Sequence, residues 1–228
     1  MTTATAPPAT APSIYLSARE TLADLLRQLG DISADRVRAN PKPGLATFED
    51  LIRVNEKASP TCEWIDNTLV EKTVGMHESW LAFLIIVKLG AYLEANDIGM
   101  CTDPDGVMKI LPGVGRAPDV AFIAWESLPD QKPRPREDKV PAIVPDLAID
   151  VLSASNTPAE MARKRDEYFR AGVKRVWEID PASRSANVFT GPNELTPVPA
   201  DGTLVGEPVL PGFALSLRDL FDRAERRA

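Results

Sequence analysis

The sequence predicts an α/β (α+β) fold, in which a mixed β-sheet is flanked by helices and preceded by an N-terminal helical extension. Apolar runs of strand length occur at 117–124 and 147–152, and a strongly capped helical pattern follows the second run. A third apolar run, KRVWEID, follows that helix. The chain has 228 residues and a hydrophobic content of 44%, which suit one main globular core.

The N-terminal part contains two predicted helices and a hairpin. Ser17 and Glu20 have the spacing of a capping box, and leucines follow them at helical spacing. A second helix begins after Thr47. The segment CEWIDNTLVEK alternates around a turn-forming Asp-Asn pair, which predicts a β-hairpin, and an apolar helix over 77–94 should follow it.

The helix after the second apolar run has clear bounds. Thr157 is a predicted N-cap, Pro158 stands in the first turn, and Gly172 ends the pattern. A last helix begins at Ser216. Together, these signals along the chain predict a disordered leader over 1–14, an N-terminal helical extension and linker over 15–45, and the main domain over 46–228.

Composition restricts the setting of the protein. The net charge of -7 gives no global positive field, so any nucleic-acid contact requires a local patch. Cys62 and Cys101 lack metal-site spacing and fit a reducing compartment, as free thiols or as a disulfide. The longest apolar stretch, 80–89, is too short to cross a bilayer. We therefore expect a cytoplasmic protein without membrane contact.

Two aspartates stand inside apolar strand patterns, where a charge is costly. Asp119 lies in APDVAFIA and Asp150 lies in LAIDVL, and a buried carboxylate must be paired, protonated or bound to a metal. Alternation gives each of them small neighbours on the same face, which leaves room beside the carboxylate. We therefore expect the two strands to be adjacent and the two side chains to share one cation.

Lys164 supplies a third charged group. It falls on the helical stripe of Met161 and Tyr168, which should face the sheet, whereas Arg163 and Arg165 point elsewhere. A lysine beside two acids can polarise a water or hold a phosphate oxygen, and carboxylate oxygens suit Mg2+ or Mn2+. This combination predicts a hydrolytic phosphodiester site.

These residues resemble those of a known family. The PD dipeptide of Asp119, the acid of IDVLSAS, Lys164 four residues before Tyr168, and AGVKRVWEIDP are similar to the Uma-two group of restriction endonucleases in the PD-(D/E)XK nuclease superfamily. The resemblance covers roughly 47–189. It implies a restriction-endonuclease-like mixed sheet flanked by helices, and a metal-dependent endonuclease that hydrolyses phosphodiester bonds of DNA.

The resemblance also implies roles for particular residues. Asp119 and Asp150 would be catalytic ligands of Mg2+ or Mn2+, although the family pattern usually has glutamate where Asp150 stands. The superfamily lysine normally lies two residues after that acid, at Leu152 here, and Lys164 is its natural substitute. Glu63 matches a hairpin glutamate, and His77 and Glu78 stand at the start of the first core helix as accessory candidates.

Each residue also has a structural interpretation. Asp119 and Asp150 could cap turns or pair with an arginine such as Arg116 or Arg163, and Lys164 could extend its ammonium past the sheet edge. A serine hydrolase built on LSAS lacks the G-x-S-x-G elbow. The functional alternative is a catalytically weak or inactive nuclease-fold module for binding or assembly. For an active enzyme, DNA is the expected partner, and a homodimer would provide the two sites that double-strand cutting requires.

Overall fold

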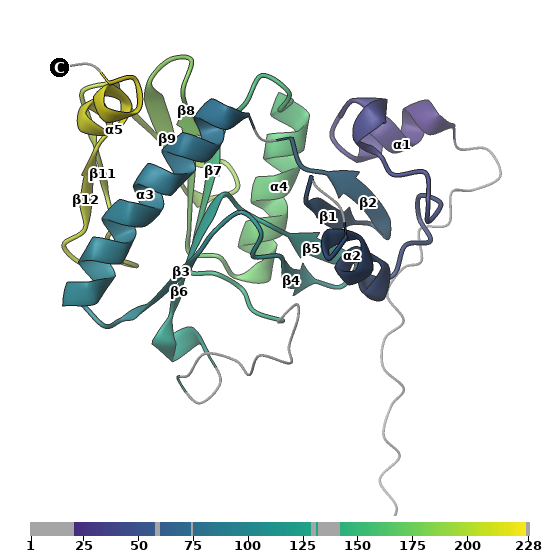
Figure 1. Ribbon diagram of the computed structural model, residues 1–228, viewed down its shortest axis with the longest axis horizontal. Helices are drawn as coiled ribbons and strands as arrows, with labels where there is room; N and C mark the ends of the chain where they lie inside the picture. The colour runs from purple at the N-terminus through teal and green to yellow at the C-terminus, as the bar shows by residue number, and fades with distance from the viewer. Residues whose placement is uncertain (1–20, 58–59, 74, 129–130, 132–141, 227–228) are drawn as a thin grey trace, which may run out of the picture.

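The computed structural model describes residues 21–57, 60–73, 75–128, 131 and 142–226, and the predicted leader over 1–14 lies outside this range. Its centre is a six-stranded sheet with the order β10-β9-β8-β7-β6-β3 (Figure 1). The strands are β3 (Gly99–Thr102), β6 (Val120–Ala124), β7 (Leu147–Val151), β8 (Arg175–Asp180), β9 (Ser185–Gly191) and β10 (Glu194–Val198). β7 and β8 are parallel and the other neighbours are antiparallel, which confirms the mixed sheet.

The parallel pair depends on helix α4 (Pro158–Ala171), which crosses over from β7 to β8. The Thr157 side chain accepts a hydrogen bond from the Glu160 backbone N–H, and Pro158 occupies the start of the helix. Gly172 ends it with φ 105°, in the left-handed region that glycine adopts without strain. The predicted bounds of this helix are confirmed.

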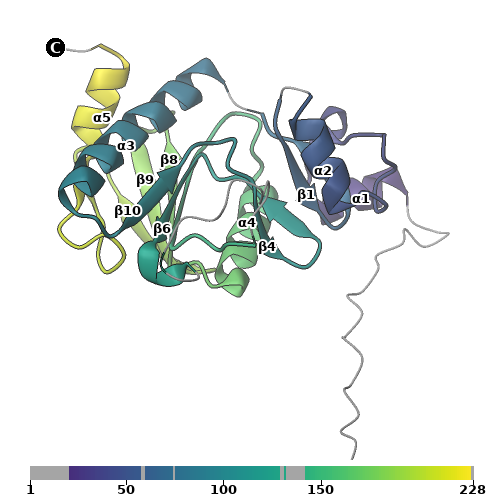
Figure 2. The same cartoon turned by 60° about the horizontal axis from the view of Figure 1, so that its bottom comes forward.

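Helices cover both faces of the sheet. α4 lies on one face, and α3 (Met76–Ala95) and α5 (Leu217–Ala224) lie on the other (Figures 1 and 2). The α3 face has an extended apolar core, in which Ile85, Phe122 and Phe221 are fully buried. The α4 face has a smaller apolar core around Tyr168, which lies beside the charged residues described below.

The apolar sequence of α3 predicts burial on nearly every side, and this prediction is wrong for one stripe. Trp80, Phe83 and Val87 are 43%, 51% and 44% exposed, because the sheet and α5 cover only the opposite side of the helix. The prediction of a segment too short for a bilayer is also wrong, since α3 has 20 residues and is apolar enough to span one. Core helices share this property, and α3 packs on the sheet.

A second sheet, with the order β2-β1-β5-β4, lies beside the first (Figure 1). Its strands are β1 (Cys62–Ile65), β2 (Thr68–Glu71), β4 (Met108–Leu111) and β5 (Val114–Arg116). β1 and β2 form the predicted hairpin, and Asp66 and Asn67 have φ 49° and 56°, as a tight two-residue turn requires. Cys62 and Cys101 are free thiols.

The N-terminal segment packs against this hairpin. It comprises α1 (Leu22–Gln28), the short 3-10 helix η1 (Ala34–Arg36) and α2 (Phe48–Asn55). Thr47 caps α2 as predicted, and Thr21 with Asp24 forms the capping box of α1. The predicted capping box of Ser17 with Glu20 lies outside the described residues. Thr21 has the extended backbone of an N-cap, and α1 begins at the next residue, Leu22.

Smaller elements complete the described chain. β11 (Thr203–Val205) and β12 (Ala214–Ser216) form a hairpin beside α5, and η2 (Trp125–Ser127) follows β6. α5 begins after Ser216, whose side chain accepts a hydrogen bond from the Asp219 backbone N–H, as the sequence predicts.

Candidate active site

The two predicted aspartates lie opposite each other on neighbouring strands. β6 and β7 are antiparallel and pair Val120 with Ile149, so the next position places Asp119 opposite Asp150. Directly opposite residues point to the same face of a sheet, here the face that α4 covers, since Lys164 of α4 contacts Asp150. The two aspartates are 5% and 3% exposed, and Asp119 Oδ2 accepts a 2.7 Å hydrogen bond from the Val151 backbone N–H. The predicted adjacency of the two strands is confirmed.

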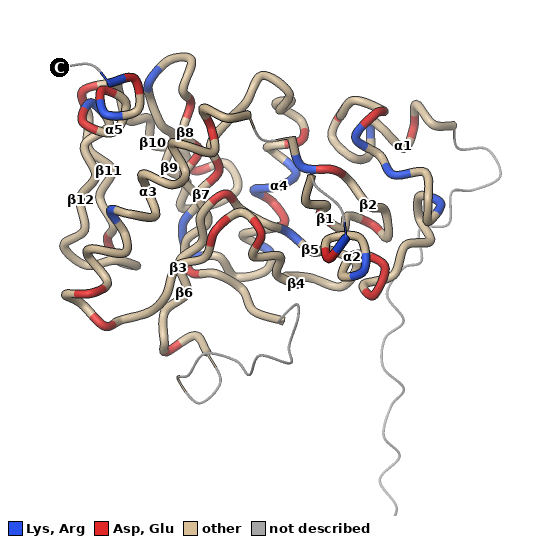
Figure 3. The backbone as a smooth tube through the Cα atoms, viewed as in Figure 1, with Lys and Arg blue, Asp and Glu red and all other residues tan. Residues whose placement is uncertain are grey.

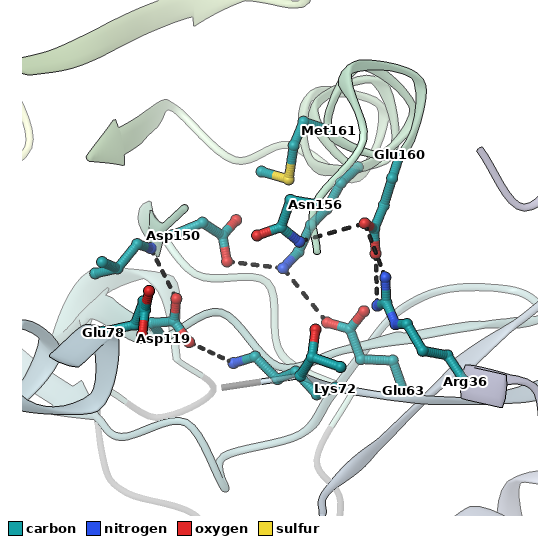
Figure 4. Close-up of a pocket in the computed structure, with 12 residues that line it drawn as sticks. Arg36, Glu63, Lys72, Glu78, Asp119, Asp150, Asn156, Glu160 and Met161 are labelled. Carbon is teal, nitrogen blue, oxygen red and sulfur yellow. Dashed lines mark hydrogen bonds and ion pairs between the residues drawn. The ribbon is translucent and has the colours of Figure 1, made fainter. Parts of the chain in front are cut away.

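Lys164 reaches this pair from α4. Figure 4 shows Asp119, Asp150 and Glu63, which line the same cavity. Lys164 Nζ donates a 2.7 Å hydrogen bond to Asp150 Oδ1 and lies 3.5 Å from Glu63 Oε1. The side chain is buried, so it does not extend past the sheet edge. Arg165, one residue further along, also faces the sheet, contrary to the prediction, and pairs with Glu178 of β8 at 2.6 Å.

Burial and charge set the protonation of this cluster. Burial alone would lower the pKa of Lys164, but Asp150 and Glu63 raise it well above its usual value. The Lys164 ammonium therefore stays charged and can donate hydrogen bonds. Burial raises the pKa of the Asp150 carboxyl, Lys164 opposes this increase, and the nearby charge of Asp119 adds to it.

Asp150 has an unsatisfied oxygen, which makes it the strongest candidate for a cation ligand. Its Oδ2 is buried and has no hydrogen-bond partner among the described residues, a costly arrangement for a carboxylate. A divalent cation would satisfy this oxygen, and Asp119 would supply a second carboxylate. The described residues contain no group of three or more Asp, Glu, His or Cys that could hold an ion. Two carboxylates still suit Mg2+, which retains waters and accepts phosphate oxygens as ligands.

Glu63 of β1 connects the hairpin to the site. Its Oε2 accepts a 2.6 Å hydrogen bond from Arg116, and its Oε1 accepts a 3.0 Å bond from the Ala117 backbone N–H. Burial alone would raise the pKa of Glu63, but Lys164, Arg116 and Lys72 together hold it well below its usual value. Arg116 also pairs with Glu167. Arg116 therefore pairs with these two glutamates and not with Asp119, contrary to the structural interpretation in which it would pair with Asp119.

Lys72 is a member of the site that the sequence does not indicate. It follows β2, is 8% exposed, and its Nζ lies 2.8 Å from Asp119 Oδ1. The same ammonium donates a 2.6 Å hydrogen bond to the Ala117 carbonyl. A lysine directly after a hairpin strand is normally solvent-exposed, so its sequence position gives no signal of burial.

Arg36 and Glu160 form a second unpredicted part of the site. Arg36 comes from η1 and donates hydrogen bonds of 3.0 and 2.7 Å to the two carboxylate oxygens of Glu160, in the first turn of α4. Asn156 donates to Glu160 at 3.2 Å. Arg36 and Glu160 are far apart in sequence. Their contact joins the N-terminal extension to the first turn of α4, the helix that positions Lys164.

The accessory candidates differ in their placement. Glu78 lines the site from the first turn of α3, whereas His77 is exposed and is not among the described residues that line the cavity. Figure 3 shows basic and acidic positions meeting where α4 faces β1 and β2. The cavity has a volume of about 20 Å³ for the centres of water-sized molecules, enough for one water or one ion. It is lined by Arg36, Glu63, Lys72, Thr73, Glu78, Asp119, Asp150, Val151, Asn156, Glu160, Met161 and Lys164.

The mixed sheet and its flanking helices are those of a nuclease-like α/β protein. A similar fold occurs in a crystal structure from Anabaena variabilis ATCC 29413, described as a "putative nuclease belonging to DUF820". The TM-score is 0.67, the sequence identity is 17%, and the match covers 78% of this chain and 98% of that chain. The Uma2 family model, described as "Putative restriction endonuclease", matches residues 45–218, so the chain belongs to that family. The search among curated proteins found no match.

Proposed function

We propose that the protein is a metal-dependent endonuclease that hydrolyses phosphodiester bonds of DNA. The observation that carries this proposal is Oδ2 of Asp150, which has no partner among the described residues and is buried opposite Asp119 on the adjacent strand. Asp119 and Asp150 would hold Mg2+ or Mn2+, the hard cations that prefer carboxylate oxygens. When bound, such an ion polarises phosphoryl oxygens and makes a coordinated water more acidic. Membership of a family described as restriction endonucleases supports DNA as the substrate.

Lys164 would act on the attacking water or on the scissile phosphate. Its ammonium lies 2.7 Å from Asp150 Oδ1, next to the proposed position of the ion. Because the Lys164 pKa is raised, the group would donate hydrogen bonds to developing negative charge instead of removing a proton. Asp150 and Glu63 hold the ammonium in place, so it needs little reorganisation during the reaction.

The alternative is a catalytically weak or inactive nuclease-fold module for binding or assembly. Two observations favour it: lysines already neutralise both aspartates, and Asp150 is one methylene shorter than the usual glutamate. The shorter side chain would place an ion differently relative to Lys164. An active endonuclease would cleave DNA and an inactive module would not, although both would have the same fold.

Titration calorimetry with Mg2+ and Mn2+ tests the metal site. The parent protein should bind one ion, and Asp119→Ala and Asp150→Ala should each abolish detectable binding. Asp146→Asn is a matched control, because Asp146 is also a buried aspartate near β7 but satisfies the Ala124 backbone N–H, Ser127 and Lys174 outside the site. It should bind the ion as the parent does.

Incubation of supercoiled plasmid DNA with the parent protein and Mn2+ tests the reaction. Nicking or linearisation that Asp119→Ala and chelation both abolish is the expected result. Metal binding without cleavage of DNA would favour the binding or assembly module. Absence of metal binding in the parent protein would contradict the endonuclease proposal itself.

A further inference from the structure

The two aspartates differ in how many of their oxygens are satisfied. Asp119 has both engaged, since Oδ2 accepts from the Val151 backbone N–H at 2.7 Å and Oδ1 contacts Lys72 Nζ at 2.8 Å. The first bond comes from the backbone at the end of β7, whereas the bond to Lys72 is made by a flexible side chain. Oδ1 is therefore the oxygen of Asp119 that can be released to another cation.

Lys72 stands between two spaces in the molecule. On one side it lines the small cavity with Asp119 and Asp150. On the other it lines an adjoining, more open groove of about 450 Å³, together with Thr73 and Ser155. The hydroxyls of Thr73 and Ser155 are hydrogen-bonded to each other at this groove. An ammonium that leaves Asp119 can therefore turn toward this more open groove, which Glu78 also lines.

Lys72 and a divalent cation would compete for Asp119. An ammonium hydrogen-bonded to a carboxylate oxygen occupies the position where a hard cation would sit, and two positive charges at one oxygen repel each other. Ala117 offers its carbonyl to the same ammonium at 2.6 Å, which keeps Lys72 in this position. Lys164 differs, because it contacts Asp150 Oδ1 and leaves Oδ2 of that residue without a partner among the described residues.

We propose that Lys72 is a further functional residue of this site: its ammonium neutralises Asp119, gives up Oδ1 when Asp119 binds its ion, and then binds a backbone phosphate of the nucleic acid in the adjoining groove. This inference rests on the proposed function. It makes Lys72 a positioning residue for Asp119 before the ion binds and a phosphate-binding residue afterwards. A merely structural lysine would only support Asp119.

The sign of the change in metal affinity distinguishes these roles. Lys72→Gln retains an N–H donor for the Ala117 carbonyl but removes the charge, and Lys72→Met removes both. Calorimetry with Mn2+ alone should show tighter binding to both variants, by about tenfold, because the competing ammonium is gone. Binding of a short DNA duplex with Ca2+ present should weaken by about tenfold, because the phosphate contact is lost. Lys109→Gln is the control, since Lys109 stacks over Phe48 outside the site and should change neither affinity.

The other outcomes have defined meanings. Mn2+ affinity that is unchanged or weaker in Lys72→Gln, with the thermal midpoint of the parent, would overturn the inference and leave the metal site standing. If neither protein binds Mn2+, the inference and the proposed function both fail. Should Lys72→Met unfold, Lys72→Gln alone decides.

Discussion

The two faces of the central sheet are built from alternate residues of the same strands, yet they differ in character. On β7, Ile149 and Val151 join the large apolar core under α3 and α5, whereas Asp150 points toward α4. On β8, Ile179 joins that core, and Glu178 lies next to Asp150 in the parallel register. Apolar burial on the α3 face therefore supplies stability, and this stability offsets the cost of burying charged groups on the α4 face.

The charged face has ion pairs beside its smaller apolar core. Lys164 pairs with Asp150, Arg165 with Glu178, and Lys72 with Asp119, all substantially buried. Removing such ions from water offsets most of their mutual attraction, so these pairs contribute little net stability. Buried charge with so little structural benefit is expected at functional sites.

The largest effect should come from the apolar face. Phe122 lies on β6, the strand that Asp119 precedes, and is fully buried on the α3 side. Phe122→Ala should lower the free energy of unfolding by about 3–5 kcal/mol, through lost apolar contact and the cavity left behind. Urea denaturation measures this loss. The Mn2+ affinity of the folded variant should match that of the parent, and a large loss of affinity would break the separation between the faces.

Lys164→Ala should produce the next largest effect, on the reaction instead of on stability. Loss of one charge-stabilising donor should lower the cleavage rate by about 100-fold, while metal affinity stays nearly intact because the carboxylates hold the ion. Lys164→Arg should not restore the rate fully, because a guanidinium is broader. Rates of plasmid nicking in Mn2+ measure both variants.

The control for Lys164 must lie on the same helix but outside the site. Arg165 is unsuitable, because it pairs with the buried Glu178. Arg170 is a better choice, since it is exposed and pairs along the helix with the exposed Asp166. Arg170→Ala should leave the cleavage rate within about twofold. Equal losses from Lys164→Ala and Arg170→Ala would mean that α4 contributes only diffuse positive charge.

A smaller change in stability should follow from the Asp150–Lys164 pair. Asp150→Asn should lower the free energy of unfolding by about 2 kcal/mol, because it leaves the Lys164 ammonium with Glu63 alone. The double variant Asp150→Asn with Lys164→Met should recover to within about 1 kcal/mol of the parent, since replacing a whole buried ion pair is often neutral. Urea denaturation of both variants is the measurement. If the double variant were less stable than Asp150→Asn alone, the charged face would be a net source of stability.

Much of the fold, and the positions of the paired aspartates in it, could be predicted from local sequence. The cost of burying two carboxylates predicted that the strands of Asp119 and Asp150 are adjacent, and helical spacing directed Lys164 toward the sheet. The caps of α4 at Thr157 and Gly172 were equally local. Such features are set by backbone periodicity and by hydrogen bonds between near neighbours.

The unpredicted features depend on tertiary contacts or on competing local signals. Lys72 and Arg36 enter the site because the hairpin and the extension pack against α4, and no local pattern encodes that packing. The start of α1 illustrates two similar local signals, because Ser17 and Thr21 both precede an acid by three residues, and Thr21 caps α1. The exposed stripe of α3 shows likewise that apolar composition does not reveal which side of a helix is covered.

The smallest predicted effect concerns the pH dependence of stability. Glu63 is 4% exposed, and Lys164, Arg116 and Lys72 overcome the effect of burial to hold its folded pKa well below the usual value of about 4.3. The unfolded chain therefore binds this proton more readily, and the stability from Glu63 is present above about pH 4.3 and lost as the pH falls toward the folded pKa.

Glu63→Gln should flatten the increase in stability with pH in that acidic window, by at most about 1.4 kcal/mol per pH unit for one proton. Urea denaturation between about pH 3 and 6 measures the slope, with Glu94→Gln on the exposed side of α3 as the control. Equal slopes for Glu63→Gln and the parent would mean that the charges around Glu63 cancel, and that this part of the α4 face is electrostatically neutral toward folding.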